Sequence, residues 1–299
     1  MSIKETKKRI VTHNGKFHTD EIFAVATIIL AHPGVDFEVV RSRDPEMPSK
    51  GDFTVDVGLV CEPENNKFDH HQEGGAGKRK NGIPYASFGL VWLKFGKVLC
   101  KSEDIARRLD EKLIVNIDAN DNGVSTFNTL FEKVSPYTIV DYFNSFAKRN
   151  AMVEENNHTF IELVEEAKSL LIREIQKEKI DESLRNEVER IYKESSGKEI
   201  IFLPKYLPWE EVLTSHPEPI FVAYPDMENE NFRVSTVPKI RGSFTSRKRF
   251  PSEWAGKTGN ELAKLTGVTD ATFCHNGRFI AGAKTKNGVM KLAELALNK

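Results

Sequence analysis

Histidine and aspartate side chains recur in four short segments of the first 125 residues. The first segment spans Thr12 to Glu21, with the letters THNGKFHTDE, and the second holds Asp56 after the letters FTV. The third is the triplet Asp69-His70-His71, and the fourth is DANDNG at 118–123. Imidazole and carboxylate ligands together favour divalent cations such as Mn²⁺, Fe²⁺, Co²⁺ or Zn²⁺. The four segments therefore predict a metal site, provided that the fold brings them together.

The number of potential ligands exceeds what one tetrahedral ion needs. Two ions that share a bridging carboxylate would use them, and such pairs lie about 3.5–4 Å apart in phosphoryl-transfer sites. Each segment alone is also compatible with an ordinary structural role, because Asp56 could cap a turn and DNG is a common turn sequence. The combination of segments, rather than any single one, carries the prediction of two metals.

The elements that would position these residues alternate between β-rich and helical segments. Strands are predicted over 9–12, 36–41 and 53–57, and helices over 21–31, 87–98 and 102–117. We expect Ser87 to be the N-cap of the second helix. Such alternation is typical of an α/β fold with a mostly parallel sheet flanked by helices. Ligands bind such sheets at the carboxyl ends of the strands, where the histidine and aspartate segments lie.

The middle of the chain is rich in charge and helical in pattern. Between 151 and 200, apolar residues from Phe160 to Ile175 recur at helical spacing, and the segment has no proline. This pattern predicts a long amphipathic helix followed by a second, charged helix. The acidic excess of the segment is typical of a solvated face.

The last hundred residues predict a smaller α+β domain. Strands are expected over 199–203, 219–224, 232–237, 271–275 and 278–283, and helices over 259–265 and 288–297. Asn276-Gly277 joins the last two strands, and this dipeptide is a strong hairpin signal. We therefore divide the chain into a first domain with the predicted metal site at 1–148, a helical connector at 149–198 and a smaller α+β domain at 199–299.

Composition excludes several classes of protein. Of the 299 residues, 39% are hydrophobic, which is enough for a folded core, and the formal net charge is −1, which excludes binding of nucleic acid by bulk charge. The three cysteines lie far apart, as is typical of a reducing cytosol. The longest largely apolar segment, Ile22 to Ala31, is shorter than the roughly 20 residues that span a bilayer. We expect a cytoplasmic protein with no membrane partner.

The DHH triplet, together with the other three segments, resembles the DHH phosphoesterase superfamily. More closely, the chain resembles the melanocyte proliferating gene family. The matching stretches are 12–21, VDVG at 55–58, FDHHQ at 68–72, 118–123, RGSF at 241–244, FPSEWAG at 250–256 and FCHNGRFIAGAKTK at 273–286. The resemblance extends over nearly the whole chain. It implies a metal-dependent phosphodiesterase, a 3′-to-5′ exoribonuclease acting on single-stranded RNA or short oligonucleotides, although older descriptions of the family say only metal-dependent hydrolase.

The resemblance also implies roles for individual residues of the first domain. The metal-ligand candidates are His13, His18, Asp20, Asp56, His70, Asp121 and Asp118. Asp56 would bridge the two ions, and Asp121 is preferred slightly over Asp118 because it lies nearer the turn at Gly123. His18 stands where superfamily members usually have an aspartate, and as a ligand it would favour softer metals. The cofactors would be two divalent ions, with Mn²⁺ as the first choice and Mg²⁺, Co²⁺, Fe²⁺ or Zn²⁺ as alternatives.

Two residues of the triplet are expected to act in catalysis. By the same resemblance, His71 would face the phosphate and help to protonate the leaving oxygen. Asp69 would orient His70 from outside the ligand set. The stretch Lys78-Arg79-Lys80 lies just after the triplet, and either a flap over the substrate or a solvated loop fits it equally well.

A basic cluster lies near the end of the chain. The resemblance to DHH proteins implies that 1–148 is the catalytic domain, that 199–299 binds the substrate, and that this cluster holds substrate phosphates. The candidate substrate-binding residues are Arg241, Gly242, Ser243, Arg247, Lys248, His275 and Arg278. The alternative is a solvated loop. The aromatic side chains Phe244, Phe250, Trp254 and Phe279 either stack on bases or belong to the core.

Two other functions stay open at this point. The first is a small-molecule phosphohydrolase that acts on a nucleotide or pyrophosphate with the same metals. The second is a non-catalytic, metal-containing RNA-binding protein, which the histidine at position 18 keeps open. A homodimer is an open alternative to a monomer.

Overall fold

The computed structural model describes residues 7–148, 150–227 and 230–299. The chain divides into two compact units, Met1–Lys179 and Ile180–Lys299. One long helix, α6 (Val153–Glu194), contributes residues to both units. The division into three parts at 148 and 198 stays a prediction. In the described ranges, no helix has the length and apolar content that crossing a bilayer requires.

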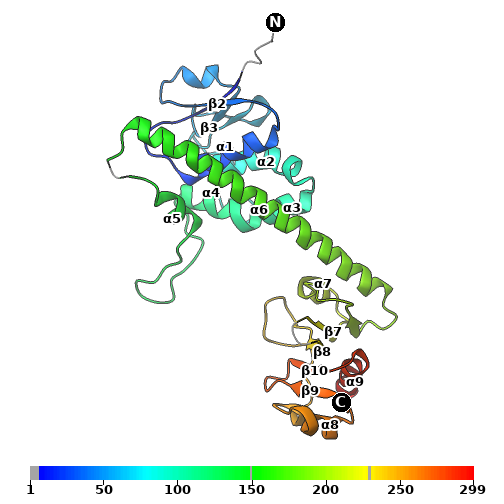
Figure 1. Cartoon of the computed structure of the whole chain (residues 1–299). Coiled ribbons are helices and arrows are strands. Elements are labelled where there is room, and N and C mark those ends of the chain that lie inside the picture. The colour runs from blue at the N-terminus through cyan, green and yellow to red at the C-terminus, as the bar shows by residue number, and fades with distance from the viewer. Residues whose placement is uncertain (1–6, 149, 228–229) are drawn as a thin grey trace. The chain divides into compact units, whose positions relative to one another are not determined.

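The first unit contains a five-stranded sheet with the order β2-β1-β3-β5-β4 (Figure 1). Its strands are β1 (Lys8–Thr12), β2 (Phe37–Arg41), β3 (Phe53–Val55), β4 (Cys61–Glu62) and β5 (Lys67–Phe68). The first four strands in this order run parallel, and β4 pairs with β5 in the antiparallel sense. The predicted mostly parallel sheet is confirmed.

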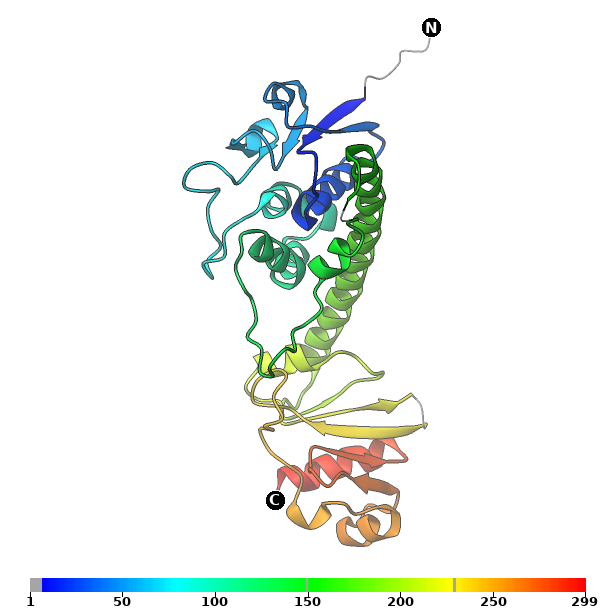
Figure 2. The same ribbon diagram turned by 90° about the vertical axis from the view of Figure 1, so that its left-hand side faces the viewer.

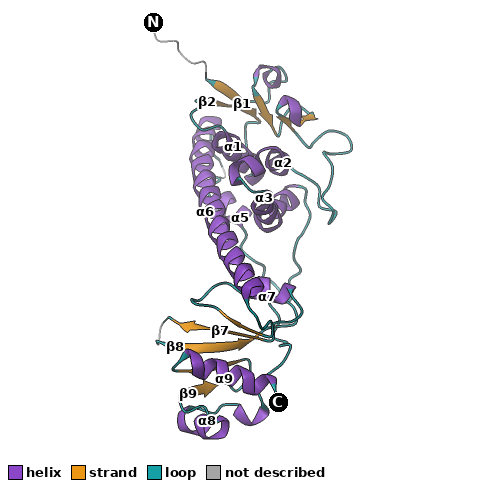
Figure 3. Ribbon diagram, turned by 90° about the vertical axis from the view of Figure 1, so that its right-hand side faces the viewer, coloured by secondary structure: helices purple, strands orange, loops and turns teal. Residues whose placement is uncertain are grey.

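Helices pack against this sheet and against one another. Their bounds are α1 (Thr19–Ala31), α2 (Ser87–Cys100), α3 (Glu103–Leu109), α4 (Val115–Asp121) and α5 (Ile139–Asn144). Helices α1 and α2 lie side by side (Figure 3), and α1 contacts β3 while α2 contacts β5. Neighbouring residues of a strand point to opposite faces of the sheet. Ile10 of β1 therefore joins the core formed with these helices, and Val11 points to the other face. There Val11 contacts Gly51, which follows the 3₁₀ helix Met47–Lys50.

Two local predictions for the helices are wrong. Ser87 is the first residue of α2, and Ala86 is its N-cap, so the Ser87 side chain is free to serve another purpose. The helix predicted over 102–117 is present from Glu103 and continues to Asp121, with a π-helical turn, Asp110–Ile114, between α3 and α4. The two helices predicted between 151 and 200 form the single helix α6, since the one glycine of that segment, Gly197, lies beyond its end.

The second unit contains a sheet with the order β6-β7-β8-β10-β9, in which only β6 and β7 are parallel. Its strands are β6 (Ile200–Phe202), β7 (Phe221–Asp226), β8 (Asn231–Thr236), β9 (Ala271–Cys274) and β10 (Ile280–Ala283), and its helices are α7 (Glu210–Ser215), α8 (Gly259–Thr266) and α9 (Lys286–Leu297). Figure 2 shows α9 packed along this sheet, where its buried Val289 and Leu292 contribute to the core. This α+β arrangement matches the prediction.

The hairpin between β9 and β10 is present, but its turn differs from the expected two-residue type. Arg278 takes the left-handed conformation, with φ of 59°, and Gly277 does not. The His275 N–H donates to the Ile280 carbonyl at 2.9 Å, and the Arg278 N–H donates to the His275 carbonyl at 2.8 Å. The loop is therefore longer than Asn276-Gly277 alone.

Candidate metal centre

Four chain segments converge at the carboxyl edge of the first sheet. His13 follows β1, Asp56 follows β3 and His70 lies two residues after β5. Because these parallel strands end at the same edge, the three side chains meet there. Asp121, the last residue of α4, reaches the same place.

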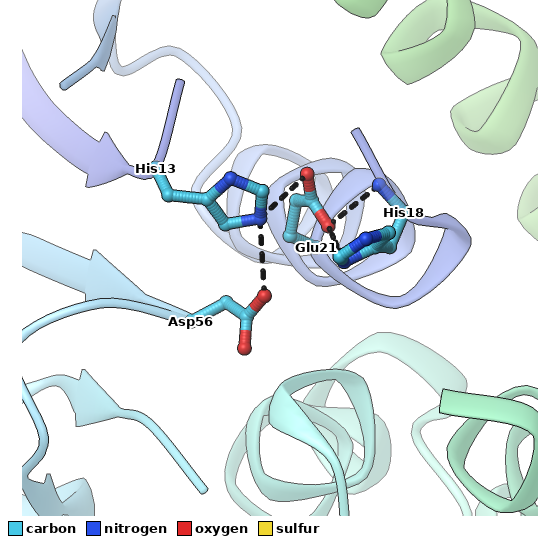
Figure 4. Close-up of side chains that lie close together, drawn as sticks. All are labelled: His13, His18, Glu21 and Asp56. Atoms are coloured by element: carbon cyan, nitrogen blue, oxygen red, sulfur yellow. Dashed lines mark hydrogen bonds and ion pairs between the residues drawn. The ribbon is translucent and has the colours of Figure 1, made fainter. Parts of the chain in front are cut away.

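The first cluster consists of His13, His18, Glu21 and Asp56, whose potential ligand atoms all lie within 4.8 Å of one another (Figure 4). His13 Nε2 lies 3.2 Å from Glu21 Oε1 and 3.3 Å from Asp56 Oδ2. His18 Nδ1 lies 3.8 Å from Glu21 Oε2. Two imidazoles and two carboxylates thus surround one small volume.

The second cluster consists of Asp56, His70 and His71. His70 Nε2 lies 3.2 Å from Asp56 Oδ1 and 3.0 Å from Asp121 Oδ2. His71 Nδ1 lies 3.3 Å from the same Asp56 oxygen. Asp56 therefore belongs to both the first and the second cluster.

The third cluster consists of His18, Asp20 and Asp121. Asp20 is fully buried at the start of α1, whereas the His18 side chain is 43% exposed. His18 Nδ1 lies 3.9 Å from Asp121 Oδ1. His18 connects this cluster with the first, as Asp56 connects the first with the second.

The backbone of Asp56 explains how its carboxylate comes between two clusters. Its φ of 57° places it in the left-handed region, where aspartate is tolerated better than most residues. Its Oδ2 faces His13, and its Oδ1 faces His70. The Ser87 hydroxyl donates to Oδ1 at 3.1 Å, so the first residue of α2 holds this carboxylate in place.

Two histidines of the site, His13 and His70, have strongly raised pKa values when no metal is present. Burial would lower the pKa of His13, but its contacts with Asp56 and Glu21 outweigh burial and raise that pKa to about 10. Burial acts in the same way on His70, and contacts with Asp121 and Asp56 raise its pKa to about 10. The negative charge of the site thus attracts cations of any kind.

The two central aspartates respond to this environment in opposite directions. Burial, reinforced by the charge of Asp56 and Asp121, raises the pKa of Asp20 well above its usual value. Burial would also raise the pKa of Asp56, but the contacts with His13 and His70 hold it below the usual range. Asp20 is therefore the carboxylate that most lacks a positive partner.

Several buried atoms of the site also lack hydrogen bonds, counted over the described residues. They are His13 Nε2, His70 Nε2, both carboxylate oxygens of Asp20, Glu21 Oε1 and Asp56 Oδ2. Four of these six atoms face an opposite charge at 3.0–3.3 Å, whereas among the described residues no ion pair reaches the two Asp20 oxygens. A buried polar atom left without a partner costs about 1–3 kcal/mol. These nitrogen and oxygen atoms converge, and they are the ligand types that first-row divalent cations prefer. The residues present therefore fit a metal site.

Glu21 is a site residue that the sequence prediction left out of the ligand set. It is fully buried, and its Oε2 accepts the backbone N–H of His18 at 2.9 Å, which closes the first turn of α1. The other oxygen faces His13. The adjacent acids Asp20-Glu21 at the start of a predicted helix were the available signal, since neighbouring residues on a helix point about 100° apart and can serve two clusters.

A cavity of about 530 Å³ opens in front of the centre. Its wall includes His13, Asp56 and His71, and it also includes Arg43. The Arg43 guanidinium lies 3.4 Å from His13 Nδ1 and donates to the Asn14 carbonyl at 3.3 Å. Arg43 is a second residue that the prediction missed, although its place just after β2 puts it at the same sheet edge as the other residues.

Asp69 positions His71 by hydrogen bonds, and its predicted role in orienting His70 stays a prediction. Asp69 Oδ1 accepts from His71 Nδ1 at 2.9 Å, and Oδ2 accepts from the Leu59 N–H at 2.6 Å. The hydrogen bond to Asp69 raises the pKa of His71 above its ordinary value. His71 is half exposed at the cavity wall, where it can meet a ligand.

Asp118 lies outside the three clusters and is held by other groups. Its Oδ2 pairs with Arg79 Nη1 at 2.7 Å, and its Oδ1 accepts the Gly89 N–H at 3.0 Å. Arg79 also pairs with Asp110 at 2.6 Å and stacks on the Tyr85 ring at 4.3 Å. Of the two aspartates left open by the sequence, Asp121 is the one near His70.

The Arg79 side chain is only 7% exposed, so neither the flap nor the solvated loop describes this residue. We expect Arg79→Ala to lower the free energy of unfolding by about 3 kcal/mol, because it leaves the buried Asp118 carboxylate without its cation. Urea denaturation checks this. The matched variant Lys80→Ala changes an exposed neighbour and should fall within about 0.5 kcal/mol of the unmodified protein. Equal stability of the two variants would contradict the anchoring role of Arg79.

Two side chains of the basic cluster form hydrogen bonds within the second unit. Arg247 donates to the carbonyls of Pro219 and Thr214, and Lys248 donates to the Leu297 carbonyl at 2.6 Å. These two side chains therefore hold the unit together, and their predicted substrate contacts stay untested.

The other predicted substrate-binding residues lie at the surface of that unit. Arg241 pairs with Glu211 at 2.8 Å, and the Gly242 N–H donates to Glu210 at 2.6 Å. The Ser243 hydroxyl accepts the Thr245 N–H at 3.0 Å.

At the β9–β10 hairpin, the His275 ring lies against the Phe279 ring at 4.4 Å. The Arg278 guanidinium makes a long contact of 3.5 Å with the Phe250 carbonyl. Of the four aromatic residues singled out in the sequence, Phe250 and Trp254 are buried core, whereas Phe244 and Phe279 are exposed.

The fold and the site define an α/β protein with a buried centre of histidine and carboxylate side chains that fits divalent metal. A family model for MYG1_exonuc, described as an uncharacterised protein family (UPF0160), matches residues 9–297. Because the match covers almost the whole chain, the protein belongs to this family.

Individual relatives agree with the family match. The chain is 30% identical to a mouse protein named MYG1 exonuclease, over 97% of this chain and 84% of the relative. It is also 30% identical to a Saccharomyces cerevisiae MYG1 protein, over 97% and 96% of the two chains. A MYG1 protein of Dictyostelium discoideum is 29% identical over the same shares. No solved structure gives a significant match.

Proposed function

We propose that this protein is a metal-dependent phosphodiesterase that acts as a 3′-to-5′ exoribonuclease on single-stranded RNA or short oligonucleotides. The observation that carries the proposal is the position of Asp56, whose two oxygens face two different groups of potential ligands. The printed name of the mouse relative, an exonuclease, supports a nucleic-acid substrate. A cytoplasmic location and the assembly state stay predictions.

The proposed centre holds two divalent ions, with Mn²⁺ as the first choice. His13 and Glu21 would bind the first ion, with His18 as a further ligand, and Asp56 would bridge the two. The second ion would be bound by Asp20, Asp56, His70 and Asp121. Such ions polarise phosphoryl oxygens and lower the pKa of water toward neutrality.

The chain supplies the remaining groups that phosphodiester hydrolysis needs. His71, whose pKa is raised by its hydrogen bond to Asp69, lies at the cavity wall and would give a proton to the leaving oxygen. Arg43 lies on the same wall and would bind a non-bridging phosphate oxygen.

The direct test is hydrolysis of a labelled RNA ten-mer by protein that has been stripped of metal. A 5′-labelled strand with Mn²⁺ should give a ladder of products that shorten one nucleotide at a time, and the metal-free reaction should give none. Release of the label as a mononucleotide at the outset would show the opposite polarity, and equal cleavage of a DNA ten-mer would remove the preference for RNA. No cleavage with Mn²⁺, Mg²⁺ or Zn²⁺ by protein that has reloaded two ions would contradict the exonuclease.

Metal loading should release protons at neutral pH. His13 and His70 have pKa values of about 10 in the metal-free protein, so both are protonated at pH 7 and must lose a proton to become ligands. We expect at least two protons per chain to be released, since Asp20 also has a raised pKa, with metal affinity rising as pH rises from 6 to 8. Calorimetry in buffers of different ionisation enthalpy measures this number. Binding heats that do not depend on the buffer would contradict these ligand assignments.

A further inference from the structure

A hollow of about 540 Å³ lies beside the candidate metal centre in the first unit. Helix α4, the loop that follows it and the start of α5 form its walls. The polar and aromatic residues that matter for its chemistry are Asn116, Asn120, Phe127 and Thr138. Its size is within the range of roughly 300–1,000 Å³ that is usual for small-molecule sites.

This hollow adjoins the metal centre through shared residues. A smaller hollow of about 210 Å³ is lined by Asp20 and Asp121, which belong to the third cluster. Asn120 and Val140 line both hollows. The two hollows therefore lie next to each other, on either side of Asn120 and Val140.

The wall of the larger hollow suits a neutral, planar, polar group better than a phosphate. Among the described residues that line it there is no carboxylate, and the one cation, Lys112, is paired with Glu174 at 2.5 Å. Hydroxyl and amide side chains supply the polar contacts instead. The negative and positive groups that phosphate chemistry requires lie in the metal centre next to it.

Two asparagines on one face of α4 supply hydrogen-bonding groups. Asn116 and Asn120 are four residues apart, so their side chains lie above one another on the helix. The Asn116 amide donates to the Lys112 carbonyl at 3.1 Å, which fixes its orientation. Over the described residues, no hydrogen bond holds the side chain of Asn120, so its donor and acceptor are both open to a ligand.

Phe127 adds an aromatic residue to the lining of the same hollow. This residue is 40% exposed, and the Ser125 hydroxyl donates to the Phe127 carbonyl at 2.8 Å, which shapes this part of the loop. Aromatic side chains stack on nucleobases of any kind, and amides hydrogen-bond to base edges.

We propose that this hollow binds the nucleoside of the nucleotide whose phosphate lies at the metal centre, with the base stacked on Phe127 and hydrogen-bonded to Asn120. The inference rests on the proposed function, because the position of the base is defined relative to a phosphate that is hydrolysed at the metal centre. It assigns hydrogen bonding of the base to Asn120, in the DANDNG segment, and stacking of the base to Phe127, in the loop after α4 and outside the four histidine and aspartate segments.

Calorimetry with two ligands tests the inference without any need for turnover. Adenosine monophosphate and ribose 5-phosphate are titrated into the full chain in the presence of Mn²⁺. We expect the adenosine compound to bind at least about tenfold more tightly, since only it can stack. Phe127→Ala should lose most of this preference, and Asn120→Ala should weaken adenosine monophosphate about fivefold.

Phe131→Ala is the matched control, because Phe131 lies in the same loop, is 72% exposed and does not line the hollow. Its affinities should equal those of the unmodified protein. Equal binding of the two ligands by the unmodified protein would overturn the inference, as would equal adenosine monophosphate affinity in all four proteins.

The RNA ten-mer assay separates this failure from failure of the proposed function. Cleavage of the ten-mer without any preference for the adenosine compound would overturn the nucleoside site alone. The protein could instead prefer adenosine monophosphate, lose this preference in Phe127→Ala, and cleave no RNA. That result would support the nucleoside site and contradict the exonuclease.

Discussion

Asp56→Asn should lower the rate of RNA hydrolysis by roughly a thousandfold or more. The Asp56 carboxylate would be shared by both metals, and metal stabilisation of the transition state is worth several kcal/mol. Asparagine keeps the size of the side chain and tolerates the left-handed backbone at this position, so the change removes charge and little else. Turnover of the RNA ten-mer under single-turnover conditions measures the effect, and mass spectrometry of the intact protein should show fewer than two bound ions.

The control for this variant is Asp36→Asn, which makes the same change at an exposed carboxylate that pairs with Lys7. Its rate and its metal content should equal those of the unmodified protein. If Asp56→Asn kept even half of the original rate, the two-metal assignment would be wrong.

Glu21→Gln should weaken the first metal about a hundredfold, a loss typical of a residue that holds or supports a metal ligand. Glutamine can still accept the His18 N–H that closes the first turn of α1, so the helix is expected to form normally. What is lost is the negative charge 3.2 Å from His13 Nε2. Titration of Mn²⁺ followed by calorimetry measures the affinity, and the hydrolysis rate should fall at low Mn²⁺ concentration.

High Mn²⁺ distinguishes this variant from the preceding one. Excess metal should restore much of the rate of Glu21→Gln, because the other ligands of the first ion remain, whereas it should not restore Asp56→Asn. Glu38→Gln, at an exposed glutamate that pairs with Arg9, should behave like the unmodified protein at every metal concentration. Identical metal titrations for Glu21→Gln and Glu38→Gln would exclude Glu21 from the centre.

The sheet and the convergence of the site could be predicted from sequence because both depend on local patterns. Short β-rich segments that alternate with helical ones predict parallel strands, and parallel strands end at one edge. The residues that follow those strands, His13, Asp56 and His70, accordingly meet. The preference for Asp121 over Asp118 rested on position in a turn, and the contact between Asp121 and His70 agrees with it.

The parts that could not be predicted depend on contacts between distant segments or on the direction of a single side chain. The pairing of Arg79 with Asp118 joins residues 39 positions apart, and a run of lysine and arginine after glycines carries no sign of burial. Whether Asp20, Glu21 or both face the centre depends on the rotation of α1, which composition does not fix. For α6, the sequence did hold the answer, since Gly197 is its one strong helix breaker and lies past Glu194.

Because of the π-helical turn Asp110–Ile114, the number of residues in this segment determines where the side chains of α4 point. A single residue more or less before α4 would change the angular phase of every later position on that helix by about 100°. Asp118, which binds Arg79, and Asp121, which lies beside His70, depend on the same phase. A deletion here would remove no ligand and would alter no identity in the DANDNG segment, yet it would aim both carboxylates elsewhere. A comparison of sequence identity would not detect such a change. A comparison of the number of residues between Ser102 and Asp121 would detect it.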